Sequence, residues 1–515
     1  MTRTGTSHDT ANWRIKNGTG VMNSNPPSRP VGSSTPGTQP DKAGWGGHPF
    51  DGTKSPSLVS QAIKLAWPAG VDQLIQTSIL FADIVLLSRL GSEVIAGVGV
   101  SAVLIFTFAA VFNAVAVAAT TVAAQAKGAA RFDVLERGAA QSVLLAVVLG
   151  IASGGLGALV AGWAMRMMGT EGLVGGYGAA YMRPVLLASP LYAIALAGGG
   201  VLRGVGDTRS PMIYTGVATV LKVFLSAVLI FGSWGFPRLG VSGAALATVF
   251  GHGLNALLVA AKLLRGFDGA RLRLRAFLPD RGLLKRIVLL WLPVAGELVI
   301  MRAGFVFYMR VVSALGTIAL AANQIAVRLE SVSLTLGFGF TVAATTLVGQ
   351  AVGRRDLAHA ERSARVTAKL AVITMGTMAV LLIVLRKWAV GMFAPEDAVR
   401  GPAIVCVVIG AFELLPLGFI FTFSGALRGA GDTLTPMVVA LVGTFVFRLP
   451  LVYLLGLRSG LGLPGIWYGT ILDWIGRSIV IYLIYRTGRW KGKAFVAEPC
   501  RPGVDILDAE ATCRE

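Results

Sequence analysis

The chain of 515 residues is 54% hydrophobic and only 14% charged, with a mean hydropathy of +0.69. This composition excludes an ordinary soluble domain and indicates an integral membrane protein. A net charge of +20 would suggest a nucleic-acid partner in a soluble protein. In a membrane protein it is typical of loops on the cytoplasmic side, so we expect the lipid bilayer as a partner and no nucleic acid.

The first 54 residues are rich in Ser, Pro, Gly, Asn and Thr and contain neither an apolar core nor the hydrophobic segment of a signal peptide. Such a composition buries too little apolar surface to fold. We therefore expect residues 1–54 to form a disordered cytoplasmic tail.

Twelve apolar runs follow the tail, and each is long enough for the roughly 20 residues that a membrane-spanning helix needs. Their lengths, and their content of Gly, Ala, Leu and Val without alternation, predict helices and exclude the strands of a membrane barrel. The runs lie near residues 57–88, 94–126, 139–168, 174–200, 211–236, 241–264, 284–312, 316–350, 364–386, 399–426, 436–457 and 463–486.

Basic residues are concentrated in the even-numbered loops between these runs, from Lys127 and Arg131 in the second loop to Arg354 and Arg355 in the eighth. Loops rich in Lys and Arg stay on the cytoplasmic side of the membrane. The pattern therefore predicts that both termini face the cytoplasm.

The chain repeats itself at a constant separation of 225 residues. The stretch LRGVGDTRSPM begins at residue 202, and LRGAGDTLTPM begins at residue 427 with eight of eleven positions identical. Pro68 and Pro293 keep the same separation, as do Gln125 and Gln350. A constant register over this length predicts two copies of one six-helix unit.

Because six is an even number, both copies enter the membrane in the same direction, and a pseudo-two-fold axis along the membrane normal relates them. The predicted fold is an all-α membrane protein of twelve transmembrane helices in two six-helix bundles. Rocking of one bundle against the other is the usual mechanical use of such a fold. The expected parts are an N-lobe over residues 55–265, a basic cytoplasmic linker over 266–283, a C-lobe over 284–489 and a cytoplasmic tail over 490–515.

We call residues 202–212 and 427–437 the hinge turns. Their glycines permit a turn, their aspartates can accept hydrogen bonds from free backbone N–H groups, and their prolines can begin the next helix. General turn chemistry favours a structural turn duplicated with its bundle over direct contact with a substrate. The hinge residues are Gly204, Gly206, Asp207, Pro211, Gly429, Gly431, Asp432 and Pro436.

The hinge turns and several longer stretches resemble the multidrug and toxic compound extrusion (MATE) family of secondary transporters. Matching stretches include VDQLIQTSILFADIVLLSRLG in the first helix and GIWYGTILDWIGRSIVIYLIYRTGRWK near the C-terminus. The similarity covers roughly residues 55–493 and is closest to the DNA-damage-inducible protein F-like bacterial branch. It implies export of small organic, often cationic, compounds across a bacterial inner (plasma) membrane, in exchange for protons or sodium ions and without a cofactor.

Asp83 is the leading candidate for cation coupling. An ionisable group inside a span costs roughly 2.5 to 3.5 kcal/mol, so it needs a partner, water or a function. Asp83 resembles the first-helix aspartate that MATE transporters use for coupling, whereas the equivalent position of the second half is Tyr308. We therefore expect the coupling site mainly in the N-lobe.

The fifth helix departs from the family pattern, because Lys222 and Ser226 stand where members commonly carry Asn and Asp. An ammonium offers no oxygen ligand to sodium, so we expect proton coupling. Our hypothesis is that an Asp83–Lys222 ion pair breaks when Asp83 takes a proton, and that this releases substrate. The alternative is a permanent structural pair with coupling elsewhere.

Asp72 and Glu297 occupy equivalent positions in the two halves. We expect both carboxylates to face a central substrate cleft together with Met301, Tyr308 and Gln324. Apolar and aromatic walls of this kind suit a drug-sized cation. Alternatively, each carboxylate is buried and satisfied by a neighbouring Gln or Ser.

The C-lobe carries further charges inside its predicted spans. We expect Arg448 to neutralise Glu413 and Arg302 to lie near Glu297, because buried charges are usually paired. Two charges of the last helix are expected near its end, where long side chains reach the interface cheaply, namely Asp473 and Arg477.

Rival classes lack the residues that they require. The chain has no HExxH, no GxSxG with partners and no GxxxxGK[ST], which argues against an enzyme or an ATP-driven pump. Cys406 lies in a span and the other two cysteines in the tail, so we expect no disulfide framework or metal site. The alternative function is a flippase for a lipid-linked sugar, which would line its cleft with arginines. A twelve-helix carrier forms its path alone, so we expect a monomer.

Overall fold

The computed structural model describes residues 57–393 and 396–494. The predicted N-terminal tail and most of the C-terminal tail lie outside the described residues. The described chain is helical, and its α-helices are α1 (Leu58–Leu87), α2 (Ser92–Gly128), α3 (Phe132–Met167), α4 (Gly172–Leu187), α5 (Ser189–Val205), α6 (Arg209–Phe231), α7 (Val241–Arg265), α8 (Arg281–Ser313), α9 (Thr317–Gly353), α10 (Leu357–Phe393), α11 (Asp397–Gly429), α12 (Leu434–Val442), α13 (Leu449–Tyr453) and α14 (Gly462–Arg486).

These helices form twelve segments that correspond to the twelve predicted runs. Nine of the described helices are long and apolar enough to cross a membrane, and the pair α4–α5, bent by 52°, would add a tenth. The remaining two segments are α8, with 33 residues, and α14, with 25 residues.

A proline lies at each of the two irregular segments. Pro190 lacks the N–H that would bond back into the end of α4, and the chain bends there between α4 and α5. Pro450 likewise removes a donor, and a π-helical turn at Gly443–Arg448 ends two residues before it. A second π-helical turn, Leu454–Arg458, completes the eleventh segment.

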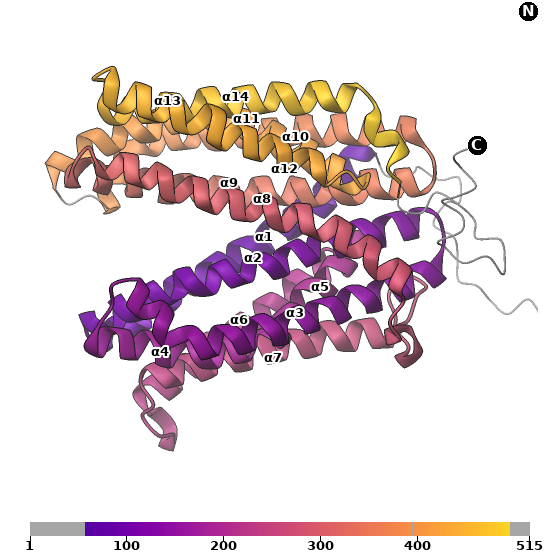
Figure 1. The fold of residues 1–515 in the computed structure, drawn as a ribbon, viewed down its shortest axis with the longest axis horizontal. Helices are drawn as coiled ribbons and strands as arrows, with labels where there is room; N and C mark the ends of the chain where they lie inside the picture. Colours follow the sequence, from indigo (N-terminus) through magenta and orange to yellow (C-terminus); the bar gives the residue numbers. More distant parts are fainter. Residues whose placement is uncertain (1–56, 394–395, 495–515) are drawn as a thin grey trace, which may run out of the picture. The chain divides into compact units, whose positions relative to one another are not determined.

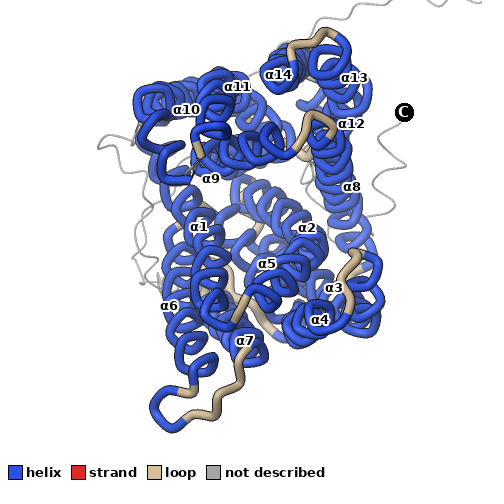
Figure 2. Tube along the Cα trace, turned by 90° about the vertical axis from the view of Figure 1, so that its left-hand side faces the viewer, coloured by secondary structure: helices blue, strands red, loops and turns tan. Residues whose placement is uncertain are grey.

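The segments assemble into two bundles, α1–α7 and α8–α14 (Figure 1). Several helices pack across the boundary between them, among them α1, α2, α8 and α9. α1 contacts α6 of its own bundle and α9 of the other, and α8 contacts α12 and α2 (Figure 2). This arrangement confirms the predicted all-α fold of two bundles.

The outer faces of the bundles are apolar. Leu159 is 82% exposed, Val220 is 71% exposed and Val384 is 68% exposed. A soluble protein rarely leaves such large apolar surfaces uncovered, whereas a membrane protein presents them to lipid.

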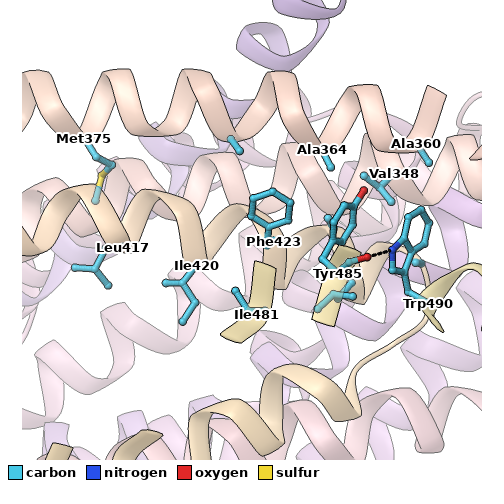
Figure 3. Close-up of a cluster of buried hydrophobic side chains, with 14 of the residues drawn as sticks. Val348, Ala360, Ala364, Met375, Leu417, Ile420, Phe423, Ile481, Tyr485 and Trp490 are labelled. Atoms are coloured by element: carbon cyan, nitrogen blue, oxygen red, sulfur yellow. Dashed lines mark hydrogen bonds between the residues drawn. The ribbon is translucent and has the colours of Figure 1, made fainter. Parts of the chain in front are cut away.

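Three aromatic side chains belong to one of the buried clusters of the second bundle. Figure 3 shows Phe423, Tyr485 and Trp490 among aliphatic residues of α9, α10 and α11. The rings of Tyr485 and Trp490 stack with centroids 5.1 Å apart, and the Trp490 indole donates to the Tyr485 carbonyl at 2.9 Å. This contact ties the chain that follows α14 to the end of the bundle.

Small residues set the spacing of helices in the first bundle. A Cβ added at Gly200 of α5 would meet the backbone of Ala116 on α2, with Cα 3.0 Å away. Transmembrane helices use such residues to bring their backbones into contact.

We expect the substitution Gly200→Ala to destabilise the protein by about 1–3 kcal/mol, because neither backbone can give way. The check is the thermal unfolding midpoint in detergent. The matched control is Gly155→Ala on α3, since an added Cβ there meets nothing within 4 Å. An equal loss of stability in both variants would contradict this explanation.

Candidate functional site

Asp83 and Lys222 form a buried ion pair inside the first bundle. Lys222 Nζ on α6 lies 2.7 Å from Asp83 Oδ2 on α1, and the two side chains are 5% and 7% exposed. The predicted pair is therefore present. A charge pair so removed from water responds strongly to the gain or loss of one proton.

Two further helices contribute to this pair. The hydroxyl of Tyr181 on α4 donates to the same Asp83 oxygen at 3.1 Å. Thr248 Oγ1 on α7 lies 3.4 Å from the Tyr181 oxygen. Four helices of the first bundle thus meet around one carboxylate, so a change of its charge bears on the packing of all four.

Ser226 lies one turn beyond Lys222 and is fully buried. Its hydroxyl has no hydrogen-bond partner within residues 57–393 and 396–494. The structure therefore brings Asp83 and Lys222 together and leaves the third predicted coupling residue outside their hydrogen-bond network.

A cavity lies beside the ion pair, between α1, α5, α6 and α7. Asp72 lines this cavity, where Arg203 Nη1 lies 3.1 Å from its Oδ2 and Gln76 Nε2 donates to the same atom at 3.3 Å. Other polar side chains of the lining include Lys222, Thr248, His252 and Asn255. The Asp72–Arg203 pair, the Lys222 ammonium and several neutral donors and acceptors therefore line one cavity of the first bundle.

No group of three or more His, Cys, Asp or Glu side chains in the described part of the chain could hold a metal ion. The site offers a carboxylate that is held by an ammonium and a phenol.

Glu297 pairs with an arginine that differs from the predicted one. Arg428 Nη2 lies 2.6 Å from Glu297 Oε1, whereas Arg302 is exposed. The expectation that Arg302 lies near Glu297 to neutralise it is therefore wrong. Arg302 follows Glu297 by five residues, and this places the two side chains on different faces of α8.

The remaining predicted cleft residues have partners of their own or are exposed. Met301 Sδ accepts from Arg477 Nη1 at 3.9 Å. Tyr308 is buried and donates to Asn323 Oδ1 at 2.7 Å. Gln324 is exposed.

The second bundle holds a different charge cluster on α14. Asp473, with a side chain 0% exposed, lies 2.8 Å from Arg448 Nε and 2.7 Å from Arg477 Nη2. Both guanidinium groups also lie over the ring of Trp474, at 4.3 and 4.9 Å from its centroid.

Two predictions for this cluster are wrong. Arg448 pairs with Asp473 and not with Glu413, whose carboxylate accepts a hydrogen bond from Thr470 instead. Asp473 and Arg477 are buried in the middle of α14 and do not lie near its end. The sequence alone does not indicate how far these positions lie from the ends of the membrane-spanning helix.

The hinge turns follow the local chemistry that their residues suggest. Gly206 and Gly431 have φ angles of +95° and +96°, a conformation that favours glycine. Asp207 Oδ1 accepts from the backbone N–H of Ser210 at 3.0 Å. In the second hinge turn, Asp432 Oδ1 accepts from the backbone N–H of Thr435 at 3.2 Å. Of the other hinge residues, Pro211 and Pro436 are buried near the starts of α6 and α12, and Gly204 and Gly429 are buried at the ends of α5 and α11.

Sequence reasoning missed Tyr181 and the pairing role of Arg203 and Arg428. A signal for the arginines was available, because Asp72 precedes Arg203 by the same 131 residues that separate Glu297 from Arg428. A charge pair kept at one spacing in both halves predicts a contact. Tyr181 had no such signal.

Comparison with known proteins agrees with this architecture. The MatE family model matches residues 68–228 and 293–454, which is more than half of the chain. The probable multidrug resistance protein NorM of Thermotoga maritima is 30% identical over 449 residues, covering 85% of this chain and 94% of its own. The protein of the same name from Rhodopseudomonas palustris is 30% identical over 455 residues, with 85% and 93% covered.

Solved structures share the fold. One described as the outward-facing conformation of a multidrug resistance MATE family transporter has a TM-score of 0.79 at 23% identity, covering 84% of this chain and 96% of that one. A MOP superfamily transporter from Pyrococcus furiosus gives the same values. With two family matches whose starting points lie one repeat apart, the chain belongs to the MatE family of multidrug and toxic compound extrusion transporters.

Proposed function

We propose that this transporter is an antiporter that exports small organic, often cationic, compounds in exchange for protons. MATE members are transporters and not enzymes. The observation that carries the proposal is the buried Asp83–Lys222 pair beside the cavity of the first bundle. A buried carboxylate that is paired with one ammonium can bind a proton in place of its ion pair.

The coupling step follows from the geometry of the pair. When Asp83 takes a proton, its attraction for the Lys222 ammonium is lost and a charge is left unpaired in a dry interior. The unpaired charge then favours a different packing of the helices that meet at Asp83. Alternating access of the cavity to the two sides of the membrane would follow from that change.

Several further features belong to the same proposal. The protein would lie in a bacterial inner membrane as a monomer, with both termini in the cytoplasm and with an N-lobe, a linker and a C-lobe at the predicted boundaries. The relatives named NorM support a bacterial multidrug exporter. The basic even-numbered loops support the orientation.

The test is efflux of a fluorescent organic cation from vesicles that contain the purified protein. We expect transport to follow an imposed pH gradient, while a sodium gradient of the same size has no effect. Transport driven by sodium alone would contradict the proposed coupling. Movement of a lipid-linked sugar without cation efflux would favour the flippase alternative.

A further inference from the structure

Helix α2 of the first bundle donates two hydrogen bonds to the second hinge turn in the other bundle. Thr121 Oγ1 donates to the carbonyl of Arg428 at 3.0 Å. One turn later, Gln125 Nε2 donates to the carbonyl of Gly429 at 2.8 Å. Both contacts join residues about 300 positions apart, so they hold one bundle to the other.

Helix α9 makes the equivalent contacts with the first hinge turn. Thr346 Oγ1 donates to the carbonyl of Arg203 at 2.9 Å, and Gln350 Nε2 donates to the carbonyl of Gly204 at 3.0 Å. Every donor and acceptor of this second set lies 225 residues from its counterpart in the first. The four bonds therefore obey the internal repeat.

The backbones of α2 and α9 touch at the same level. A Cβ added at Gly128 would meet the backbone of Gln350, with Cα 2.8 Å away. A Cβ added at Gly353 would meet the backbone of Gln125, with its carbonyl carbon 3.0 Å away. Glycine at both positions lets the backbones of the two helices come into direct contact.

The acceptors lie where both hinge turns end a helix, and the carbonyls of Arg203 and Arg428 also accept from the backbone N–H groups of Gly206 and Gly431. α5 ends at Val205 and α11 ends at Gly429, and the last four carbonyls of a helix have no partner within it. In each hinge turn, two of these carbonyls accept from the opposite bundle. The ends of α5 and α11 therefore lie at this level in the two halves.

Each hinge turn also joins this contact to a carboxylate of its own bundle. The carbonyl of Arg203 accepts from α9 while its guanidinium pairs with Asp72 in the cavity. The carbonyl of Arg428 accepts from α2 while its guanidinium pairs with Glu297. The side chain holds the turn in the position at which its carbonyl can be reached.

We infer that the four hydrogen bonds from Thr121, Gln125, Thr346 and Gln350 to the hinge turns form a gate that closes the transport path at this face. This inference rests on the proposed alternating access. Opening requires α2 and α9 to withdraw from the opposite hinge turns, and water then replaces each lost bond. Each of these hydrogen bonds contributes little net free energy, so a gate built from them can open in every transport cycle.

The test measures the distance between the bundles at this face by electron spin resonance. Spin labels are placed at Asp133 and Ala358, which are exposed and lie one repeat apart near the starts of α3 and α10. The native cysteines Cys406, Cys500 and Cys513 are first replaced by serine. Purified protein in lipid nanodiscs is measured without substrate or ion gradient, so the result does not depend on what is transported.

Removing two bonds in the variant Thr346→Val/Gln350→Leu is expected to raise the ratio of open to closed molecules on the order of tenfold. The equivalent variant in the other half, Thr121→Val/Gln125→Leu, should raise this ratio by the same amount. The single variant Thr346→Val serves if a double variant does not fold, with a smaller shift in the same direction. Glu297→Gln should also widen the distance, through Arg428.

The chain offers a matched control one residue away. Thr120 donates to the carbonyl of Gly200 at 2.9 Å and Thr345 donates to that of Gly425 at 3.0 Å, in both cases within one bundle. Thr120→Val/Thr345→Val should leave the distances unchanged. Unchanged distances in the gate variants, or an equal shift in this control, would overturn the gate. Loss of coupled efflux with a normal shift of distances would count against the proposed function alone.

Discussion

Replacing Asp83 with Asn is expected to reduce efflux driven by a pH gradient to the rate of passive leak. Asn cannot gain or lose a proton at this site, although it keeps the shape of Asp83 and still accepts from Tyr181. The measurement is the initial rate of efflux of a fluorescent cation from vesicles, with and without the gradient.

The single substitution also leaves Lys222 without its buried partner, which can itself impair folding. The double variant Asp83→Asn/Lys222→Met removes both charges at similar volume. It should fold as well as the wild type and still fail to respond to pH. If the double variant retained pH-driven efflux, the pair would be structural and the coupling site would lie elsewhere.

The second large effect is expected in the C-lobe, on stability. Asp473→Asn removes the one carboxylate that Arg448 and Arg477 share. Loss of one partner from a buried ion pair costs about 3–5 kcal/mol, because the remaining charge keeps its desolvation cost. We expect a large fall in the thermal unfolding midpoint of the protein in detergent.

A surface ion pair on α11 supplies the control for that variant. Arg400 Nη1 lies 3.0 Å from Asp397 Oδ1, and the Asp397 side chain is 90% exposed. Water replaces such a contact at little cost, so Asp397→Asn should leave the unfolding midpoint unchanged. If Asp473→Asn were equally harmless, the α14 cluster would not stabilise the second bundle.

The fold was predictable because the signals for it are local or periodic. Apolar runs of membrane length give the twelve segments, and the 225-residue register gives the two bundles. The Asp83–Lys222 pair was also within reach, because the chain replaces the usual oxygen ligands of the fifth helix with a single base. Each of these predictions rests on a single feature of the sequence.

The partners of the C-lobe charges could not be predicted, because pairing depends on helix rotation and depth. Arg448 illustrates the difficulty. Lys222 lies eleven residues after Pro211, whereas Arg448 lies twelve residues after Pro436. The π-helical turn Gly443–Arg448 accommodates one extra residue, and the arginine then faces α14 instead of the first helix of its half.

The same extra residue appears in the family comparison. The two matched segments begin 225 residues apart, at 68 and 293, and end at 228 and 454. The second is thus one residue longer, and the π-helical turn lies within it. A repeat that is regular in sequence up to this point therefore builds charge pairs of different geometry in its two halves.

The most direct test of proton coupling at Asp83 is calorimetry of substrate binding to the purified protein in buffers that differ in ionisation enthalpy. Such a series gives the number of protons that the protein releases or takes up when a substrate cation binds. We predict that the wild-type protein releases a proton on binding and that Asp83→Asn/Lys222→Met releases none. Equal proton release by the two proteins would contradict the assignment of coupling to Asp83.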